Sequence, residues 1–301
     1  MADPSLFTKT SGSSFTALLI YVDDILIAGN CKPQINELKE FLDKSLRIKD
    51  LGHLNFFLGI EAVRTADGIS LFQRKYTLEI LKENGFLEAK PASTPATTGL
   101  KLVSSEGVPL DNPEIYRRLI GKLLYLTNTR PDISHVVQQL SQFVDMPTNI
   151  HLTAAHRVLR YLKGSPGKGL FYHANSHVQL KRFSDSDWAN CIESRMSITG
   201  FCIYLADLSV KFDVATPLFC DNLSAIAIGE NHVFHERTKH IEIDCHIVKQ
   251  KVHEGLIKLL PVSSQKQIAD GFTKALPKPA FETFHSKLGI HDIHVPAYGG
   301  C

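Results

Sequence analysis

The chain has 301 residues, 44% of them hydrophobic, and a formal net charge of only +2. This length allows about one to three globular domains, and so small a charge indicates no partner by itself. The six cysteines stand singly, the first residues are polar, and no apolar run approaches the roughly 20 residues that span a bilayer. We therefore expect an intracellular protein of the cytoplasm or nucleus, without disulfides, and exclude a secreted or membrane-spanning one.

Residues 15–28 predict a β-hairpin. Two apolar, β-favouring runs flank a short acidic centre, Asp23-Asp24, which places both carboxylates at the turn. An amphipathic helix is expected next, since apolar side chains recur there at helical spacing: Ile35, Leu38, Phe41, Leu42 and Leu46.

A second hairpin and a short helix are predicted next. Asp67-Gly68 is a strong tight-turn signal between two apolar runs. Residues 76–84 are typical of a helix that Gly85 ends. Residues 90–107 are rich in Pro, Ser, Thr and Gly, so we expect a linker there.

Three helices are predicted after the linker. The first begins near Pro113, the second near Pro131, and the third runs from about Leu152 to Lys163. Residues 164–169 form a flexible joint, where we place a domain boundary.

A mixed α/β pattern follows this joint. The segments GLFYHA, VQLKRFSDSDWA and ITGFCIYL are typical of strands. The remaining predicted elements are a strand at 217–220, helices near 222–229 and 240–253, a strand at 257–262 and a final helix near 267–275.

The adjacent acids Asp23 and Asp24 are the first candidate site. Two carboxylates at a hairpin tip repel each other, and a divalent cation such as Mg²⁺ would neutralise them. The alternative is a plain turn, because Asp-Asp pairs often serve only that purpose.

Three spaced acids after residue 169 are the second candidate. Asp185 lies near the end of a predicted strand, Asp221 follows the strand PLFC, and Asp270 opens a predicted helix. Acids at strand ends and a helix start can converge in space, although each alone is more often a cap or turn residue.

The segment from His235 to His246 is rich in histidine and includes Lys239 and His240. Zinc is disfavoured because the ligand spacing matches no standard four-ligand structural site: Cys245 and His246 are adjacent, and the segment has no pair of cysteines. A helix that presents basic and His side chains to phosphate fits better.

A basic stretch lies between Arg117 and Arg182, with ten Lys or Arg residues against two Asp or Glu. Such a stretch suits nucleic acid, although a solvated helical surface is an equal alternative. The candidate contacts in this stretch are Arg117, Arg118, Arg157, Arg160 and Lys163.

Nine sequence blocks, in this order, resemble the Pol polyprotein of copia-type LTR retrotransposons. They are YVDDILIAG, FFLGIE, YRRLIGKLLYLTNTRPDISHVVQQLSQF, RVLRYLKGSPGKGL, SDSDWA, SITGF, CDNLSAI, HERTKHIEID and QIADGFTKAL. Together they are specific for that family, whereas no single block would be.

The resemblance implies an α+β, mixed fold with three domains. These are a partial reverse-transcriptase palm at 1–90, helices of a thumb and connection at 91–168, and a ribonuclease H-like α/β domain at 169–301. It implies copying of RNA into DNA and cleavage of RNA–DNA hybrids with Mg²⁺ or Mn²⁺. Asp23 and Asp24 would belong to the polymerase site, and Asp185, Asp221 and Asp270 to the ribonuclease site.

Two departures from the family pattern predict a truncated and inactive chain. Only twenty residues precede Tyr21, so the upstream metal-binding Asp of the palm is expected to be missing, and with it polymerase activity. Only fifteen residues separate Leu205 from Asp221, too few for the family's next strand and the helix that supplies a catalytic Glu. We expect an internal deletion near Leu205-Ala206.

Three hypotheses remain open. The chain is an inactive Pol remnant, a non-catalytic module that binds an RNA–DNA hybrid or a single strand, or a weakly active ribonuclease H. In the third case Asp187 or Asp213 would replace the Glu, whereas Glu193 is not in a suitable position.

Overall fold

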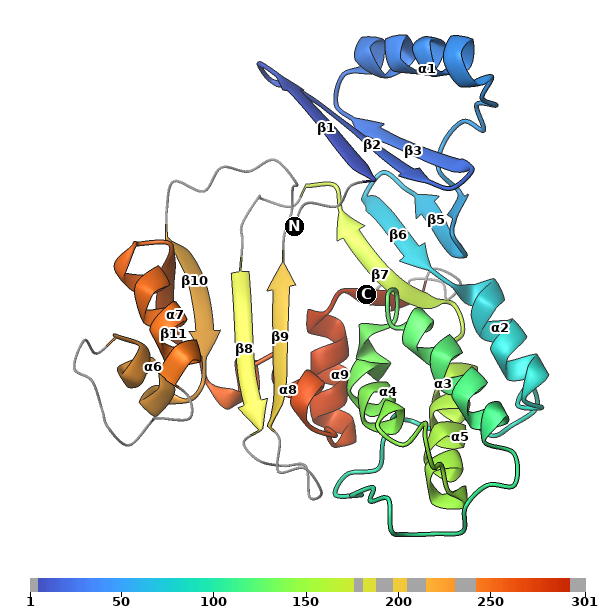
Figure 1. Cartoon of the computed structure of the whole chain (residues 1–301), viewed down its shortest axis with the longest axis vertical. Coiled ribbons are helices and arrows are strands. Elements are labelled where there is room, and N and C mark those ends of the chain that lie inside the picture. Colours follow the sequence, from blue (N-terminus) through green and yellow to red (C-terminus); the bar gives the residue numbers. More distant parts are fainter. Residues whose placement is uncertain (1–4, 176–180, 188–196, 205–214, 231–241, 293–301) are drawn as a thin grey trace, which may run out of the picture. The chain divides into compact units, whose positions relative to one another are not determined.

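The computed structural model describes residues 5–175, 181–187, 197–204, 215–230 and 242–292 (Figure 1). The chain forms two compact units, the N-terminal unit of residues 1–63 and the C-terminal unit of residues 64–301. The segments 91–168 and 169–301, predicted as separate domains, therefore share one unit, and the three-domain division stays a prediction. None of the helices in these ranges has the length and apolar character that crossing a bilayer requires.

The N-terminal unit contains a three-stranded antiparallel sheet in the order β1-β2-β3. Its elements are β1 (Leu6–Ser11), β2 (Ser14–Tyr21), β3 (Asp24–Gly29), α1 (Lys32–Leu46), β4 (Phe56–Phe57) and β5 (Ile60–Arg64). The predicted hairpin is β2-β3, and the predicted helix is α1. Strand β1 was not predicted, because five of its six residues are exposed and the segment LFTKTS shows no apolar alternation.

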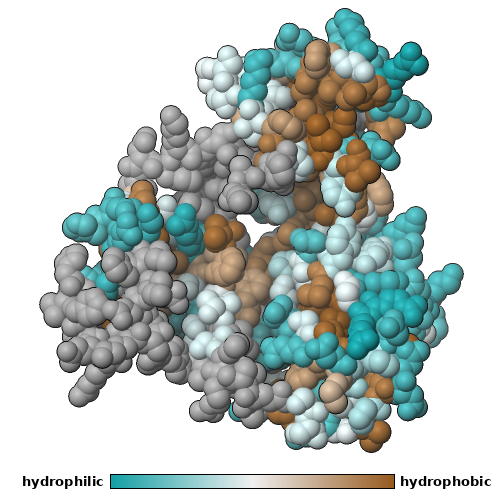
Figure 2. All heavy atoms as spheres, viewed as in Figure 1, coloured by the Kyte–Doolittle hydropathy of each residue, from teal (hydrophilic) through white to brown (hydrophobic). Residues whose placement is uncertain are grey.

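The apolar face predicted for α1 is present but hardly buried. Of its five apolar side chains only Leu42 is buried, whereas Phe41 is 65% exposed and Leu46 is 61% exposed. Apolar surface is correspondingly visible on this unit (Figure 2). A narrow sheet offers too little apolar surface to cover the whole helix face.

The C-terminal unit contains the predicted helices. They are α2 (Arg74–Glu83), α3 (Pro113–Leu126), α4 (Ser134–Ser141) and α5 (Asn149–Lys163). Gly85, with φ of +74°, follows α2 as expected, and the Asn112 side chain caps α3 by accepting the N–H of Glu114 at 3.1 Å. The segment predicted as a linker has no regular structure, but it packs on α5, where the Ala92 N–H donates to the Arg160 carbonyl.

Within this unit, three strands of one sheet lie in the order β12-β7-β6 and pair antiparallel. Its strands are β6 (Gly68–Phe72), β7 (Lys168–His173) and β12 (Ile290–Asp292). The predicted turn before β6 is confirmed, since the Thr65 N–H donates to the Gly68 carbonyl at 2.8 Å. Strand β7 was expected to belong with the later strands, but it pairs with β6.

A second sheet has the order β11-β10-β8-β9 (Figure 1). Its strands are β8 (Lys181–Asp187), β9 (Ile198–Tyr204), β10 (Thr216–Cys220) and β11 (Ile257–Pro261). Strand β10 is parallel to both β8 and β11, whereas β9 is antiparallel to β8. Helices α6 (Leu223–Glu230) and α7 (Glu242–His253) contact β11, and α8 (Asp270–Thr273) contacts β8 and β9. The helix predicted at 267–275 is thus shorter, and α9 (Lys278–Lys287) and β12 were not predicted.

A buried ion pair between Arg130 and Asp132 contacts both α5 and α9. The guanidinium of Arg130 donates to both carboxylate oxygens of Asp132, at 3.0 and 2.8 Å, and to the carbonyl of Ser165 at 2.9 Å. The Tyr161 hydroxyl of α5 also donates to Asp132, and His285 of α9 lies 3.7 Å from it. Around this pair the apolar side chains of α2–α5 and α9 form one continuous core.

The His285 side chain predicts a loss of stability in acid. Burial lowers its pKa from 6.5 to about 4; Asp132 opposes this shift, whereas Lys168, Arg130 and His291 favour it. Because the unfolded state protonates more readily, the free energy of unfolding should fall as the pH drops from 6.5 to 4, by on the order of 3 kcal/mol. Urea unfolding of the wild type and His285→Gln at several pH values measures this. If the free energy of unfolding changes equally with pH in both proteins between pH 6.5 and 4, the prediction is contradicted.

Candidate metal centre

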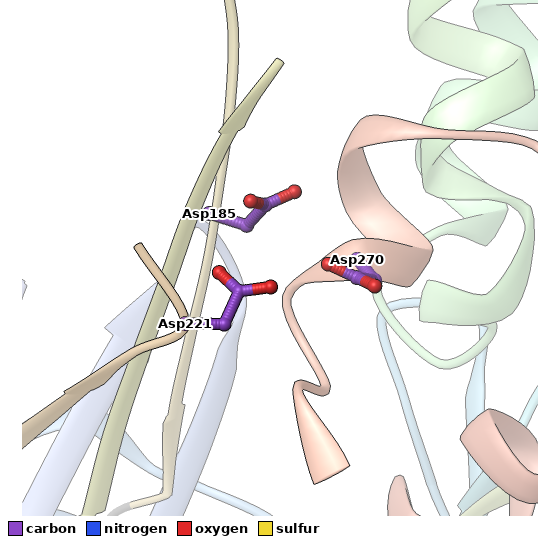
Figure 3. Close-up of side chains that lie close together, drawn as sticks. All are labelled: Asp185, Asp221 and Asp270. Carbon is purple, nitrogen blue, oxygen red and sulfur yellow. The ribbon is translucent and has the colours of Figure 1, made fainter. Parts of the chain in front are cut away.

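Three aspartates from separate parts of the sequence meet at one end of the β8–β10 pair. Asp185 lies on β8, Asp221 directly follows β10, and Asp270 is the first residue of α8. Each offers a carboxylate oxygen within 4.8 Å of the others, and the side chains point toward one another (Figure 3). The parallel pairing of β8 with β10 puts Asp221 beside Asp185, and α8 brings the third acid to them.

Close packing on a glycine brings α8 to the sheet. Gly200 of β9 is the cross-strand partner of Asp185, and a Cβ there would lie 2.8 Å from the Ala269 carbonyl oxygen. The Gln267 side chain, also buried, donates to the Ser184 carbonyl at 3.0 Å. The segment leading into α8 is therefore fixed against β8 and β9.

Two hydroxyls orient the acids. Thr273 Oγ1 of α8 donates to Asp185 Oδ2, and Ser264 Oγ donates to Asp221 Oδ2 at 3.1 Å. Neither residue was singled out from the sequence, nor were Gly200 and Gln267. The motif QIADGFTKAL contains two of these four residues, Gln267 and Thr273, so its spacing around Asp270 was the available signal.

A lysine lies beside the acids. The Lys274 ammonium nitrogen is 3.1 Å from Asp270 Oδ1 and 4.0 Å from Asp185 Oδ2. Burial raises the pKa of Asp270; Lys274 opposes the rise, and the other two carboxylates add to it. Burial lowers the pKa of Lys274, but Asp270, Asp185 and Asp221 more than offset this, so the pKa lies above its ordinary value. Negative charge therefore dominates the centre.

The donor set fits a hard divalent cation. All three groups are carboxylates, the oxygen ligands that Mg²⁺ and Mn²⁺ accept. Asp270 Oδ1 is buried and, within the described part of the chain, accepts no well-formed hydrogen bond, although the Lys274 ammonium is near. A cation at this point would give this oxygen a ligand bond in place of its ion pair with Lys274.

In the described ranges no fourth acid, histidine or cysteine joins this group. Asp187 ends β8 and lies outside the cluster. Glu193, Asp213 and the junction at 205–206 lie outside the described residues.

Asp23 and Asp24 form the hairpin tip of the N-terminal unit, as predicted. Both aspartates are exposed, and Tyr21 pairs with Asp24 across the turn. Val22, which directly precedes Asp23, has φ of +50°. A positive φ is strained for a β-branched residue. Over the residues that the structure describes, no third acid gathers with this pair. Metal binding here stays a prediction.

Several of the predicted nucleic-acid contacts are engaged within the chain. The Arg117 guanidinium donates to the Val144 and Asp145 carbonyls, at 2.8 and 3.1 Å. Arg157 donates to Thr94 Oγ1 at 3.0 Å, and Arg160 donates to the Lys90 carbonyl at 2.9 Å. Arg118 is exposed and Lys163 is half-buried, while Lys239 and His240 lie outside the described residues. The site as a whole remains a prediction.

Sequence comparisons supply the family. The family described as "Reverse transcriptase (RNA-dependent DNA polymerase)" matches residues 2–98. The chain is 35% identical over 341 positions to the retrovirus-related Pol polyprotein from transposon RE2 of Arabidopsis thaliana, and 36% identical over 331 positions to that from transposon RE1. These alignments include 100% and 96% of this chain, but only 23% of each relative.

A putative transposon Ty5-1 protein of Saccharomyces cerevisiae is 30% identical, over 69% of this chain and 68% of its own length. No solved structure matches the chain. The chain therefore belongs to the family of copia-type retrotransposon Pol polyproteins and contains a reverse-transcriptase domain. It spans about a quarter of the length of the two Arabidopsis relatives.

Proposed function

We propose that residues 169–301 are a ribonuclease H-like domain of a Pol polyprotein that retains a three-carboxylate metal centre but cannot cleave RNA. The observation that carries this proposal is the convergence of Asp185, Asp221 and Asp270 from two neighbouring strands and a helix start. A divalent cation held there would polarise phosphate oxygens, and in a site with its full set of acids it would also generate a hydroxide nucleophile. The chain's own contribution is to hold the three oxygens together and to fix two of the acids through Thr273 and Ser264.

Loss of catalysis is supported by two further observations. The alignment with the RE2 relative extends over 341 positions, 40 more than the 301 residues of this chain. That difference is large enough for the strand and helix expected between Leu205 and Asp221. The second observation is the lack of a fourth acid around the three, within the described ranges.

The exposed surface of β9 fits the same proposal. Phe201 and Ile203 are 68% and 53% exposed, and their partners on β8 are Ser184 and Arg182. Gly200 and Cys202 alternate with them on β9 and face α8 and the core. The open side of β9 is where a further helix would pack, and the deletion would remove it.

The proposed partner is an RNA–DNA hybrid or a single strand, bound with Mg²⁺ or Mn²⁺. Support comes from the family and from the excess of ten basic over two acidic residues between Arg117 and Arg182. Binding without cleavage is therefore the second candidate function. Several of these arginines form hydrogen bonds within the chain, so the metal centre supports the proposal more strongly than the basic stretch does.

The test measures metal binding and hybrid cleavage on the same full-length preparation. Wild-type protein should bind Mn²⁺ and melt at a higher temperature with it, because three carboxylates lose their mutual repulsion. Asp221→Asn should weaken Mn²⁺ binding by about tenfold or more, since one charged ligand is removed. With either Mg²⁺ or Mn²⁺, the RNA strand of a labelled hybrid should remain uncut.

The matched control is Asp111→Asn, because Asp111 is an exposed aspartate of the same unit that belongs to no such cluster. It should bind Mn²⁺ as the wild type does. Cleavage that Asp221→Asn abolishes would refute the proposed inactivity. Mn²⁺ binding that survives Asp221→Asn unchanged would refute the metal centre.

A further inference from the structure

We propose that Lys274 is a built-in counterion of the three-aspartate centre, which holds the acids together without metal and gives way when a divalent cation binds. The inference rests on the proposed metal centre and adds a positioning residue to it. Its consequence is that Lys274 reduces the metal affinity of the site.

The position of Lys274 within the fold supports this role. It follows α8 directly, four residues after Asp270, so its side chain returns toward the helix start. Its ammonium contacts Asp270 at 3.1 Å and lies 4.0 Å from Asp185, so it reaches two of the three acids. Both carboxylates are largely buried, with side-chain exposures of 12% and 14%.

The charges explain why a counterion is needed. Three ionised carboxylates within 4.8 Å of one another repel strongly where water is partly excluded. Of the other polar contacts, Thr273 and Ser264 supply neutral hydroxyls that orient two acids without cancelling charge. One ammonium cancels one of the three negative charges, whereas a divalent cation cancels two, so exchanging the ammonium for the cation lowers the repulsion further.

Lysine is suited to an exchange of this kind. Its ammonium is a point charge on a flexible stem, and the side chain here is 46% exposed, so it can swing into water at small cost. Asp270 Oδ1, the atom nearest to the ammonium, accepts no well-formed hydrogen bond from it. The oxygen therefore remains available to a cation that approaches more closely.

The test compares Lys274→Met with the wild type in the full-length chain. Methionine keeps the length and apolar stem but removes the charge. In EDTA the variant should melt several degrees lower, because the acids lose their counterion. Its affinity for Mn²⁺, measured by titration calorimetry, should rise about fivefold to tenfold, and saturating Mn²⁺ should restore its melting temperature to the wild-type value.

Two further variants separate charge from packing. Lys274→Arg keeps the charge and should leave both the EDTA melting temperature and the Mn²⁺ affinity near the wild-type values. Lys278→Met removes an exposed lysine that pairs with Glu282 at 3.8 Å and, among the residues that the structure describes, with no other acid, and it should change neither quantity.

The outcomes also separate this inference from the proposed function. If the wild type binds Mn²⁺ and Lys274→Met binds it no more tightly, the counterion role is refuted and the metal centre stands. If no variant binds Mn²⁺, the metal centre is refuted together with the exchange. Weaker Mn²⁺ binding by Lys274→Met would also overturn the inference.

Discussion

Asp132→Ala should lower the free energy of unfolding of the C-terminal unit by about 3–5 kcal/mol, because it leaves a buried guanidinium without its partner. The Arg130 and Asp132 side chains are 1% and 0% exposed, so water cannot replace the lost carboxylate. Tyr161 and His285, which converge on the same carboxylate, lose their contacts as well. Urea unfolding followed by circular dichroism gives the difference.

The double variant Arg130→Met with Asp132→Leu is the informative control. Removing both charges leaves no buried ion unpaired, so it should be considerably more stable than Asp132→Ala alone. Glu282→Ala breaks an exposed pair with Lys278 and should cost only about 0–1 kcal/mol. If Asp132→Ala costs no more than this exposed substitution, the buried pair does not hold the unit together.

Local patterns in the sequence predicted most helices and strands correctly, because their signals lie within a few residues. Asn112-Pro113 marks the start of α3, and the cap hydrogen bond to Glu114 is the physical reason. Asp67-Gly68 marks a turn in the same way. The short helix α8 shows the limit, since a helix of nine residues was expected where Asp270–Thr273 is helical. The backbone is already extended at Lys274, with φ of −144° and ψ of 154°, so the helix ends before the residue that Pro277 restricts.

Long-range pairing could not be predicted from local patterns. Strand β7 begins within the predicted joint at 164–169 and was grouped with the strands after it, yet Leu170 pairs with Leu71 of β6. Nothing within either strand specifies that partner. The same holds for the ion pair of Arg130 with Asp132, whose burial depends on Tyr161 and α9 lying over it.

The acids of the candidate site could be predicted, but not all of the residues that position them could. Asp185, Asp221 and Asp270 stand out because strands and a helix start precede or contain them. Gly200 matters only through contacts across the fold, so no local signal identifies it, whereas Lys274 lies four residues after Asp270 and could have been found from that spacing. Arg157 and Arg160, two arginines on one helical face, also contact the chain's own segment at 90–94, which no local pattern indicates, and their contact with nucleic acid stays a prediction.

Gly200→Val should disrupt the metal centre without touching any of its acids. A Cβ at this position would lie 2.8 Å from the Ala269 carbonyl and 2.9 Å from the Phe272 and Thr273 side chains, so α8 must move away from β9. Asp270 begins α8 and Thr273 holds Asp185, so both would shift from the other acids. We expect Mn²⁺ affinity to fall at least about tenfold, with a loss of about 1–3 kcal/mol in stability from overpacking.

Gly121→Ala provides the matched control, because Gly121 lies within α3 and a Cβ there meets no atom within 4 Å. It should stabilise the unit by about 0.5–1 kcal/mol, since alanine restricts the unfolded chain and favours the helix, and it should leave Mn²⁺ affinity unchanged. Circular dichroism in urea and Mn²⁺ titration of both variants separate the two effects. Wild-type Mn²⁺ affinity in a folded Gly200→Val protein would mean that close packing of α8 on β9 does not determine the spacing of the three carboxylates.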